Sequence, residues 1–563
     1  MYPVVGRRTT SGIFRADFTP RFPEWKHFFA CARHRERARI VLVLSLASWF
    51  GFAFISFDLC RSVVKGVAFP DQMPRTLTSD FLSELAARLD AAHKSQDRRY
   101  PGSSFERRPI HVVYGGAHLF KSATARRLGD IALRSLDDFA PDFISFAKAI
   151  GLPGSERLSA TALDSTTPDF TALEKSIESD AEAAACENPA AWLAYTVYKR
   201  VREKLTREPV EDYRIDFEDG YGNRPDAEED AHAVAAAKEL AAGIRANSLP
   251  PFFGVRIKPF TAALRERSLR TLDLFLSELA SHARETLPKQ FRIMLPKVTL
   301  PDEVSALADV CSRLEPLLDF EPGALRIEIM IESPRAIFNE RGEVGVLPLV
   351  AAARGRCIGA HFGPYDYTAS LDIAAPTNAL THSASDFARE IMQVALAGTG
   401  VALSDGPTNI LPIPPHTAGE AAAKGQSAPL TAKERGENAV VVHRAWRLHF
   451  QNIRHALAAG FYQGWDLHPA QLPVRYAATY SFLLENLDST SRRMRNFIDA
   501  AAQATRLGHV FDDAAMAQGL LNYFRQAINC GALTPTELES RTTLTPADLR
   551  ASSFAQILTS HKP

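Results

Sequence analysis

The 563-residue sequence has few cysteines, and no two of them are spaced as a metal or redox motif would require. There is no C-x-x-C pair, which excludes a zinc ribbon and a disulfide framework and favours a reducing compartment. The six are Cys31, Cys60, Cys186, Cys311, Cys357 and Cys530. Net charge is equally scarce, since 65 Lys and Arg balance 65 Asp and Glu. Without an overall positive field, a dedicated nucleic-acid-binding protein is not expected.

The sequence also lacks the short motifs that mark several common enzyme classes. It contains no G-x-x-x-x-G-K-[ST] loop, no G-x-G-x-x-G turn, no H-E-x-x-H pair and no G-x-S-x-G elbow. P-loop ATP hydrolysis, nicotinamide redox chemistry, zinc peptidase activity and serine hydrolysis therefore lose their main support. What is present is an ordinary globular composition, with 46% hydrophobic and 23% charged residues, which excludes disorder along most of the chain.

Residues 1–72 form a basic and hydrophobic N-terminal extension that differs from the rest of the chain. Nine Lys or Arg stand against three Asp or Glu in residues 1–39, and the 18 residues of 40–57 carry no charge. Three interpretations stay open: a membrane anchor or uncleaved signal, an organellar transit-like segment, or a dispensable upstream extension. Met73 opens a capped helical pattern that is typical of a natural start. We expect a cytoplasmic protein, with a membrane-anchored or organellar location as the alternative and membrane contact only if residues 40–57 are a real anchor.

From about residue 110 the chain alternates between short β-branched runs and longer stretches with helical periodicity. The runs are apolar without strict alternation, as expected of parallel strands that are buried on both faces. Strands are predicted at 110–115, 213–219, 252–259, 291–298, 325–333, 357–366, 400–408 and 464–469. Eight such βα units predict an α/β fold, a closed (β/α)8 TIM barrel over residues 73–480.

Three segments exceed what a minimal barrel needs. Residues 151–212 have helical periodicity and predict a helical insertion. Residues 413–438 are rich in small, polar and Pro residues, which is typical of a loop on the barrel rim. Residues 481–563 predict an α-helical C-terminal tail that packs on the barrel.

Polar residues follow nearly every predicted strand, and in a barrel those strand ends meet at one end of the molecule. They are Asp216, Glu218, Asp219, Arg256, Lys258, Lys297, Glu332, Asp366, Asp405 and His468. We expect all of them to project into one shared site. Such a cluster of acids with a few cations is costly unless a metal and an anionic ligand neutralise it.

Glu332 and Asp366 end consecutive predicted strands, the fifth and the sixth. Two carboxylates on neighbouring strands suit a hard cation that keeps several waters and accepts substrate oxygens, which predicts Mg2+ with Mn2+ as the alternative. Either residue alone could equally be a structural acid in a salt bridge. Their joint position favours the metal-binding interpretation.

The cations and the histidine each have two interpretations. Arg256 could hold a substrate carboxylate or polarise a carbonyl oxygen, or it could pair with the acids of the DFED segment. Lys297 could contact a phosphate or carboxylate or form a Schiff base, but charge balance against Glu332 is the simpler interpretation. His468 is expected to be a structural hydrogen-bonding residue before a base.

Several motifs in collinear order resemble one known family. They are DFEDG (216–220), GVRIKP (254–259), LPKVTLPDEV (295–304), IESPRAIFN (331–339), FGPYDYTASL (362–371), SDGPTN (404–409) and AAGFYQGWDLHPAQLPV (458–474). From about residue 105 to 476 the chain resembles the citrate-lyase β-chain-like family, also called the HpcH/HpaI aldolase group, whose fold is the phosphoenolpyruvate/pyruvate-domain barrel. The IESPRAIFN and GPYDY segments also resemble malate synthases, which share the barrel and the metal site.

This resemblance implies a Mg2+-dependent lyase or synthase that works through an enolate. Carried over by position, Glu332 and Asp366 match the metal ligands, and Arg256 matches the catalytic arginine that also grips the 2-oxo acid. The acids Asp216, Glu218 and Asp219 match an acidic signature beside the metal, with Asp219 and Lys297 as further catalytic candidates. Asp216, Glu218 and His468 are expected to help bind the substrate.

The sequence departs from that family where a catalytic base is expected. Thioester-using relatives carry an aspartate base after the barrel, but here Ala517 stands at the comparable position, with Asp512 and Asp513 at the wrong spacing. His361 and His118 are the other candidate bases.

We therefore expect a metal-dependent carbon–carbon lyase, or aldolase, that acts on a 2-oxo or 3-hydroxy acid or its CoA thioester. The alternatives are a malate-synthase-like enzyme that condenses acetyl-CoA with glyoxylate, and a non-catalytic metabolite-binding barrel. The partners expected are a small-molecule acid or acyl-CoA and further copies of the chain in a homo-oligomer, without nucleic acid.

Overall fold

The computed structural model describes residues 76–102, 106–158, 171–282, 287–417, 429–499, 505–507, 510–512, 514–550 and 557. The extension of residues 1–72 and the uncharged run at 40–57 therefore lie outside the described residues. Within the described ranges, no helix is both long and apolar enough to cross a membrane. The helix α3 (Ser79–Arg99) has no buried residue and falls mainly in a separate N-terminal unit.

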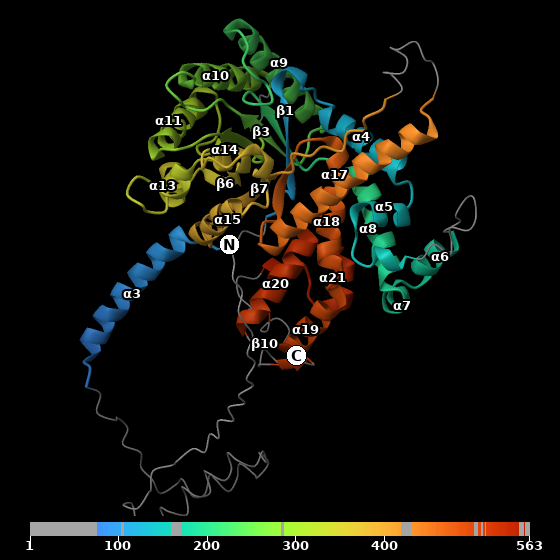
Figure 1. The fold of residues 1–563 in the computed structure, drawn as a ribbon. Coiled ribbons are helices and arrows are strands. Elements are labelled where there is room, and N and C mark those ends of the chain that lie inside the picture. Colours follow the sequence, from blue (N-terminus) through green and yellow to red (C-terminus); the bar gives the residue numbers. More distant parts are fainter. Residues whose placement is uncertain are drawn as a thin grey trace, which may run out of the picture. The chain divides into compact units, whose positions relative to one another are not determined.

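Eight parallel strands close into a barrel, in the order β1-β2-β3-β4-β5-β6-β7-β8, as the sequence predicted. The strands are β1 (His111–Gly116), β2 (Asp212–Asp216), β3 (Phe252–Arg256), β4 (Phe291–Leu295), β5 (Arg326–Ile331), β6 (Cys357–Phe362), β7 (Ala402–Pro407) and β8 (Gln463–Asp466). Each strand pairs with its sequence neighbour, and β1 pairs with β8 to close the barrel. Figure 1 shows helices surrounding these strands.

The connections between strands are helical, and their apolar faces cover the outer surface of the barrel. The helices are α4 (Thr124–Phe139), α5 (Phe143–Ile150), α9 (Asp226–Ala246), α10 (Arg265–His282), α11 (Pro301–Leu317), α12 (Pro334–Ile337), α13 (Val346–Ala352), α14 (Pro364–Ala369), α15 (Ser383–Leu396) and α17 (Ala432–Ala458). Short 3-10 turns lie at η2 (Ala117–Leu119) and η6 (Pro469–Gln471). The strands are buried on both faces, which explains why their sequences read as near-continuous apolar runs.

The described parts of the insertion and the tail are mostly helical, with one addition. The helices of the insertion are α6 (Thr171–Ser179), α7 (Ala181–Glu187) and α8 (Pro189–Arg207), and those that follow β8 are α18 (Leu472–Leu484), α19 (Leu487–Asp499), α20 (Ala514–Asn529) and α21 (Pro535–Thr542). An antiparallel pair, β9 (Thr505–Leu507) and β10 (Val510–Asp512), interrupts the tail where only helix was predicted. The predicted rim loop ends earlier than residue 438, because Thr431 caps α17 by accepting the backbone N–H of Glu434.

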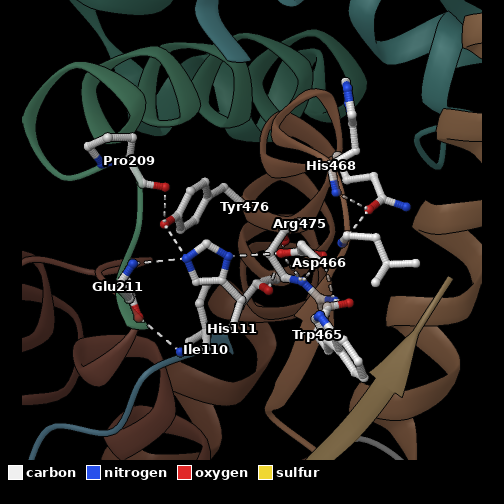
Figure 2. A network of polar contacts seen from close by, with 12 residues as sticks. Ile110, His111, Pro209, Glu211, Trp465, Asp466, His468, Arg475 and Tyr476 are labelled. Carbon is white, nitrogen blue, oxygen red and sulfur yellow. Dashed lines mark hydrogen bonds and ion pairs between the residues drawn. The ribbon is translucent and has the colours of Figure 1, made fainter. Parts of the chain in front are cut away.

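A buried polar network fastens β1 to β8 and to α18 (Figure 2). Asp466 is its centre: one of its oxygens lies 2.8 Å from His111 Nδ1, and Arg475 donates to the other at 2.8 Å. The second ring nitrogen of His111 accepts the backbone N–H of Glu211 at 2.9 Å. Asp466 is fully buried, and although burial alone would raise its pKa, Arg475 and then His111 hold that pKa well below its ordinary value. We call these residues the closure network.

The tail also holds the chain segment that leads into β1. The side chain of Asn529, at the end of α20, accepts from the backbone N–H of Arg108 at 2.9 Å and donates to the carbonyl of the same residue at 3.0 Å. A single amide side chain thus satisfies both backbone groups of a residue just ahead of the first strand.

Candidate functional site

The strand β2 ends in a carboxylate that fixes the guanidinium at the end of β3. Arg256 donates through Nε to Asp216 Oδ1 at 2.7 Å and through Nη2 to Asp216 Oδ2 at 2.5 Å. Asp216 also accepts the backbone N–H groups of Glu218 and Gly220, at 3.0 and 2.8 Å. A Cβ on Gly220 would lie 2.5 Å from Asp216 Oδ2, so this close turn requires glycine. This bidentate ion pair is buried and fixes the orientation of the Arg256 guanidinium.

The turn after β2 brings two further acids to the lysine that follows β4. Lys297 Nζ donates to Glu218 Oε1 at 2.5 Å and lies 3.3 Å from Asp219 Oδ1. The remaining oxygen of Glu218 lies 3.1 Å from Arg256 Nη1. Burial alone would lower the pKa of Lys297, but its hydrogen bond with Glu218 raises that pKa above its ordinary value. Lys297 is therefore a charged ammonium, which opposes the Schiff-base interpretation.

Glu332 follows β5 and is almost fully buried against the loop after β6. Its Oε1 accepts the backbone N–H of Lys297 at 2.5 Å, and Lys297 has a left-handed backbone with φ of 51°. A Cβ on Gly363 would lie 2.6 Å from both Cβ and Oε2 of Glu332, so only glycine leaves room for this carboxylate. Burial, then the charge of Asp366, raises the pKa of Glu332 to about 8.

Asp366 stands in the first turn of α14, directly after β6, and its side chain is about half exposed. Its Oδ2 lies 3.8 Å from Lys297 Nζ, which therefore lies within 4 Å of three different carboxylates. The structure thus brings together the predicted residues from β2, β3, β4, β5 and β6. The five carboxylates are Asp216, Glu218, Asp219, Glu332 and Asp366, and the two cations are Arg256 and Lys297.

The donor set of this cluster fits a hard divalent cation. In the described part of the chain, no three His, Cys, Asp or Glu side chains are arranged to hold a metal by themselves. Magnesium, however, is usually bound through one or two carboxylates, with waters and substrate oxygens completing its shell. Glu332 and Asp366 supply two such carboxylates. Burial is the first cause of the raised pKa of Glu332, and the charge of Asp366 adds to it while Lys297 opposes it, so a bound cation would favour the carboxylate anion there.

Two aromatic side chains that the sequence analysis missed lie against Arg256. The guanidinium carbon stands 4.6 Å from the ring centre of Tyr114, on β1, and 5.4 Å from that of Trp465, on β8. The two rings also contact each other, with centroids 4.5 Å apart. Such cation–π contacts hold the arginine in place while leaving it charged. From the sequence alone, both aromatics would be assigned to the hydrophobic core. The register of β1 against β8 is what places them beside Arg256.

Comparison with known proteins adds a family to this geometry. Residues 89–557 match a family described as Domain of unknown function (DUF6986). The chain belongs to the DUF6986 family. No curated protein matches this chain.

Several solved structures are similar to the DUF6986 chain at low identity. A citrate lyase from Burkholderia xenovorans LB400 is 18% identical, with a TM-score of 0.44, over 61% of this chain and 91% of its own. The protein CitE from Mycobacterium tuberculosis, in complex with magnesium, acetoacetate and coenzyme A, is 18% identical, with a TM-score of 0.36, over 59% and 95%. A malate synthase from Haloferax volcanii, in a pyruvate/acetyl-CoA ternary complex, is 15% identical, with a TM-score of 0.32, over 62% and 88%.

The expectation that every strand-end charge enters one site is wrong for two residues of the DUF6986 chain. Lys258 Nζ donates to the carbonyl of Phe217 at 2.5 Å and pairs with Glu229 of α9 at 3.0 Å. Asp405 of β7 pairs with Arg389 of α15 at 2.9 Å. Asp405 is one residue from the inward-facing Ser404, so its side chain points to the outer side of the barrel. Lys258 lies in the loop after β3, where its side chain reaches α9 instead of the acidic cluster.

His468 also stands apart from the acidic cluster. Its Nδ1 accepts the backbone N–H of Ala470 at 3.2 Å and so caps the η6 turn (Figure 2). Among the described residues, no hydrogen bond or ion pair connects His468 with Arg256, Lys297 or Glu332. Burial lowers its pKa, which suits the structural interpretation.

The other candidate bases have different positions in the DUF6986 chain. His118 lies in η2, with its ring 5.6 Å from that of Tyr221, and burial lowers its pKa. Ala517 is fully buried in α20, Asp512 ends β10, and Asp513 lies outside the described residues. His361, by contrast, is on an inward position of β6, where its Nε2 lies 3.3 Å from Glu328 of β5.

Proposed function

We propose that this DUF6986 protein is a divalent-metal-dependent carbon–carbon lyase of the citrate-lyase β-chain-like, or HpcH/HpaI aldolase, type. Its substrate is a 2-oxo or 3-hydroxy acid, free or as its CoA thioester, and the reaction passes through an enolate. The observation that carries the proposal is the placement of two carboxylates, Glu332 and Asp366, at the ends of adjacent strands, with Arg256 fixed by Asp216 in the same cluster. The family resemblance of the motifs supports the same reaction class.

The residues of the site would divide the work as follows. Glu332 and Asp366 would hold Mg2+ or Mn2+, which, when bound, orients substrate oxygens and stabilises negative charge on an enolate oxygen. Arg256 would bind the 2-oxo acid on the same face, since its guanidinium is held rigid by Asp216 and by two aromatic rings. Glu218 and Asp219 would keep Lys297 beside the metal carboxylates, where its ammonium group can meet an anionic substrate.

Two alternatives are less well supported. A malate-synthase-like condensation needs a carboxylate base from the segment after the barrel, but the comparable position holds the buried Ala517. A non-catalytic metabolite-binding barrel has no need for a buried carboxylate whose pKa is raised to about 8, since a hydrophobic residue would be more stable there.

The decisive experiment is a calorimetric titration of Mg2+ into metal-stripped full-length protein, with and without oxalate as a mimic of a 2-oxo acid enolate. We expect oxalate to bind only when Mg2+ is present. The variants Glu332→Gln and Asp366→Asn should abolish this binding, because each removes one ligand charge with little change in shape. The matched control is Asp309→Asn, whose carboxylate lies in an exposed pair with Arg354.

The outcomes separate the alternatives. Failure of folded wild-type protein to bind either Mg2+ or oxalate would contradict the lyase proposal and favour the metabolite-binding barrel. Binding of oxalate without metal would contradict the roles of Glu332 and Asp366. If oxalate binds as expected, turnover of 2-oxo acids and of acyl-CoA thioesters can be screened, and consumption of glyoxylate with acetyl-CoA would favour the condensing enzyme.

A further inference from the structure

The interior of the barrel contains a column of polar side chains beneath the acidic cluster. Strand register places Arg214, Glu328, His361 and Tyr114 at inward positions of β2, β5, β6 and β1. Charged and titratable groups are rarely buried in a barrel interior without a function or full compensation. Tyr114 is the member of this column that contacts Arg256.

The bottom of the column is an anchored carboxylate. Glu328 accepts from Arg214 Nη2 at 2.6 Å and lies 3.5 Å from Arg292 Nε. Burial alone would raise the pKa of Glu328, but Arg214 and then His361 hold it far below its ordinary value. Glu328 is therefore a permanent anion, and its position is fixed by two arginines.

The anchored carboxylate orients a histidine, and the histidine faces a phenol. His361 Nε2 lies 3.3 Å from Glu328 Oε2, and its Nδ1 lies 3.4 Å from the hydroxyl of Tyr114. His361 and Glu328 are 4% and 6% exposed, whereas Tyr114 is only partly buried. The carboxylate, imidazole and phenol thus form a chain whose last member alone is accessible. Contacts of this length in a protein without substrate can shorten when the substrate binds.

This inference rests on the proposed function. We propose that Tyr114 is the general acid–base group of the reaction, and that His361 and Glu328 position it and exchange its proton. This assignment supplies the base that the tail does not provide at Ala517. A carboxylate that orients an imidazole, which in turn activates a hydroxyl group, is an established arrangement for moving a proton.

The proton transfers form a cycle that returns Tyr114 and His361 to their starting protonation states. The substrate hydroxyl, β to the activating carbonyl, gives its proton to the Tyr114 oxygen while the phenolic proton passes to His361 Nδ1. The O–H electron pair then forms the carbonyl of one product, and the carbon–carbon bond breaks with its pair entering the enolate of the other. Tyr114 next protonates the enolate carbon and recovers its proton from His361. One proton has moved from oxygen to carbon, and no further reactant is needed.

The surroundings of His361 suit this cycle. The groups that face it are Glu328 from β5 and Tyr114 from β1, while Ser404, its register partner on β7, is uncharged. Glu328 can balance the imidazolium that forms during the transfer. Burial raises the pKa of Tyr114, so that the phenol stays protonated and serves as a donor until the histidine accepts its proton.

The test is the exchange of pyruvate methyl protons for deuterium, followed by NMR in D2O with Mg2+, on full-length protein. Wild type should catalyse this exchange, because the same relay removes and returns a proton at carbon. Tyr114→Phe keeps the ring on Arg256 and loses only the hydroxyl, so the exchange rate should fall by about 100-fold or more while oxalate affinity stays unchanged. Tyr480→Phe, which removes the hydroxyl of a buried tyrosine in α18, is the matched control and should exchange at the wild-type rate.

His361→Gln tests the positioning role and serves as a second route if Tyr114→Phe does not fold. The rate at saturating pyruvate should fall about 10-fold or more with KM unchanged, a split that a merely structural role would not produce. Exchange at the wild-type rate in Tyr114→Phe would overturn the assignment and leave the proposed function standing. The same holds if wild type binds oxalate with Mg2+ but exchanges no protons. If wild type does not bind oxalate with Mg2+, the proposed function fails and the assignment falls with it.

Discussion

The closure network and the acidic cluster are both buried groups of charges, but they are balanced in opposite ways. Asp466 meets His111, Arg475 and His449 at 3.0 Å or less, and its pKa is held well below the ordinary value. Glu332 accepts one backbone N–H and lies beside Asp366, and its pKa is raised to about 8. The same type of side chain at a similar depth is thus stabilised as an anion in one place and destabilised in the other.

This difference distinguishes buried charges that stabilise the fold from buried charges that belong to the candidate site. Where charge only holds strands together, each acceptor has a donor and the anion is preferred at every physiological pH. Where donors are fewer, as at Glu332, burial makes the anion less favourable than the neutral carboxyl group. Burying the Glu332 carboxylate costs free energy that folding alone does not offset. In the proposed function, a bound cation would relieve this cost, so it would favour binding.

The most destructive change we expect is Asp466→Asn in the closure network. It would leave the cation Arg475 and its neighbours without a buried anion and should lower the free energy of unfolding by about 3–5 kcal/mol. Because the folded pKa of Asp466 lies below its ordinary value, this contribution is complete at neutral pH and is lost only as the pH falls below about 4. Urea denaturation at pH 7.5 measures the effect, and a loss under about 1 kcal/mol would show that the network is not what closes the barrel.

A change of the opposite sign is expected for Glu332→Gln in protein stripped of metal. The folded pKa of about 8 exceeds the ordinary 4.5, so wild-type stability should fall as the pH rises from about 4.5 to 8 and then level off. The variant should lack this slope and be more stable than wild type at pH 8.5, by up to a few kcal/mol. Thermal melts in EDTA between pH 5.5 and 8.5 give the result, and Mg2+ should restore only the wild type. Parallel slopes in the two proteins would refute the electrostatic account.

Lys297→Met tests the comparison between the two regions by removing a cation from the acidic cluster. Glu218, Asp219 and Asp366 would lose their shared ammonium, so Mg2+ alone should bind more tightly, by about tenfold, while oxalate with Mg2+ should bind more weakly. Calorimetric titration with each ligand separates the two effects. Equal weakening of both would mean that Lys297 mainly supports the backbone turn in which it lies.

The smallest effect is expected from a surface pair that belongs to neither region. Arg354 and Asp309 form an ion pair with side chains 58% and 61% exposed. Arg354→Ala should change the free energy of unfolding by less than about 1 kcal/mol and leave Mg2+ binding unaltered. Urea denaturation of this variant and of Asp466→Asn under the same conditions compares their losses in the free energy of unfolding. A loss similar to that of Asp466→Asn would remove the basis for distinguishing buried from exposed charge here.

The strands and the positions of Glu332 and Asp366 could be predicted from sequence because both follow from local rules. Apolar runs of the right length predict parallel strands, and residues directly after them lie at one end of a barrel, which placed Glu332 and Asp366 correctly beside Lys297. The error at Asp405 has the same origin, whereas Lys258 was misplaced because it lies in the loop after β3. A shift of one residue along a strand reverses the side to which a side chain points, and strand ends cannot be read to that precision.

The remaining parts could not be predicted because they depend on partners that are distant in sequence. Tyr114 reads as a core aromatic until the closure of β1 on β8 brings it to Arg256 and His361. His111 and Asp466 are separated by 355 residues, so no local pattern connects them. The alternation of charge at every second residue, as in Asp212, Arg214 and Asp216, was a usable signal for the polar interior.

The bonds that join the first strand to the last strand and to α20 also determine when the barrel can be completed during synthesis. The clamp between Asn529 and Arg108 spans 421 residues, and the closing contact between β1 and β8 spans almost as many. A ribosome therefore releases seven strands, with β1 unpaired on one side, well before the last strand and the clamp exist. Closure is a late, long-range event, and the exposed edge of β1 is the surface that the growing chain has to protect longest.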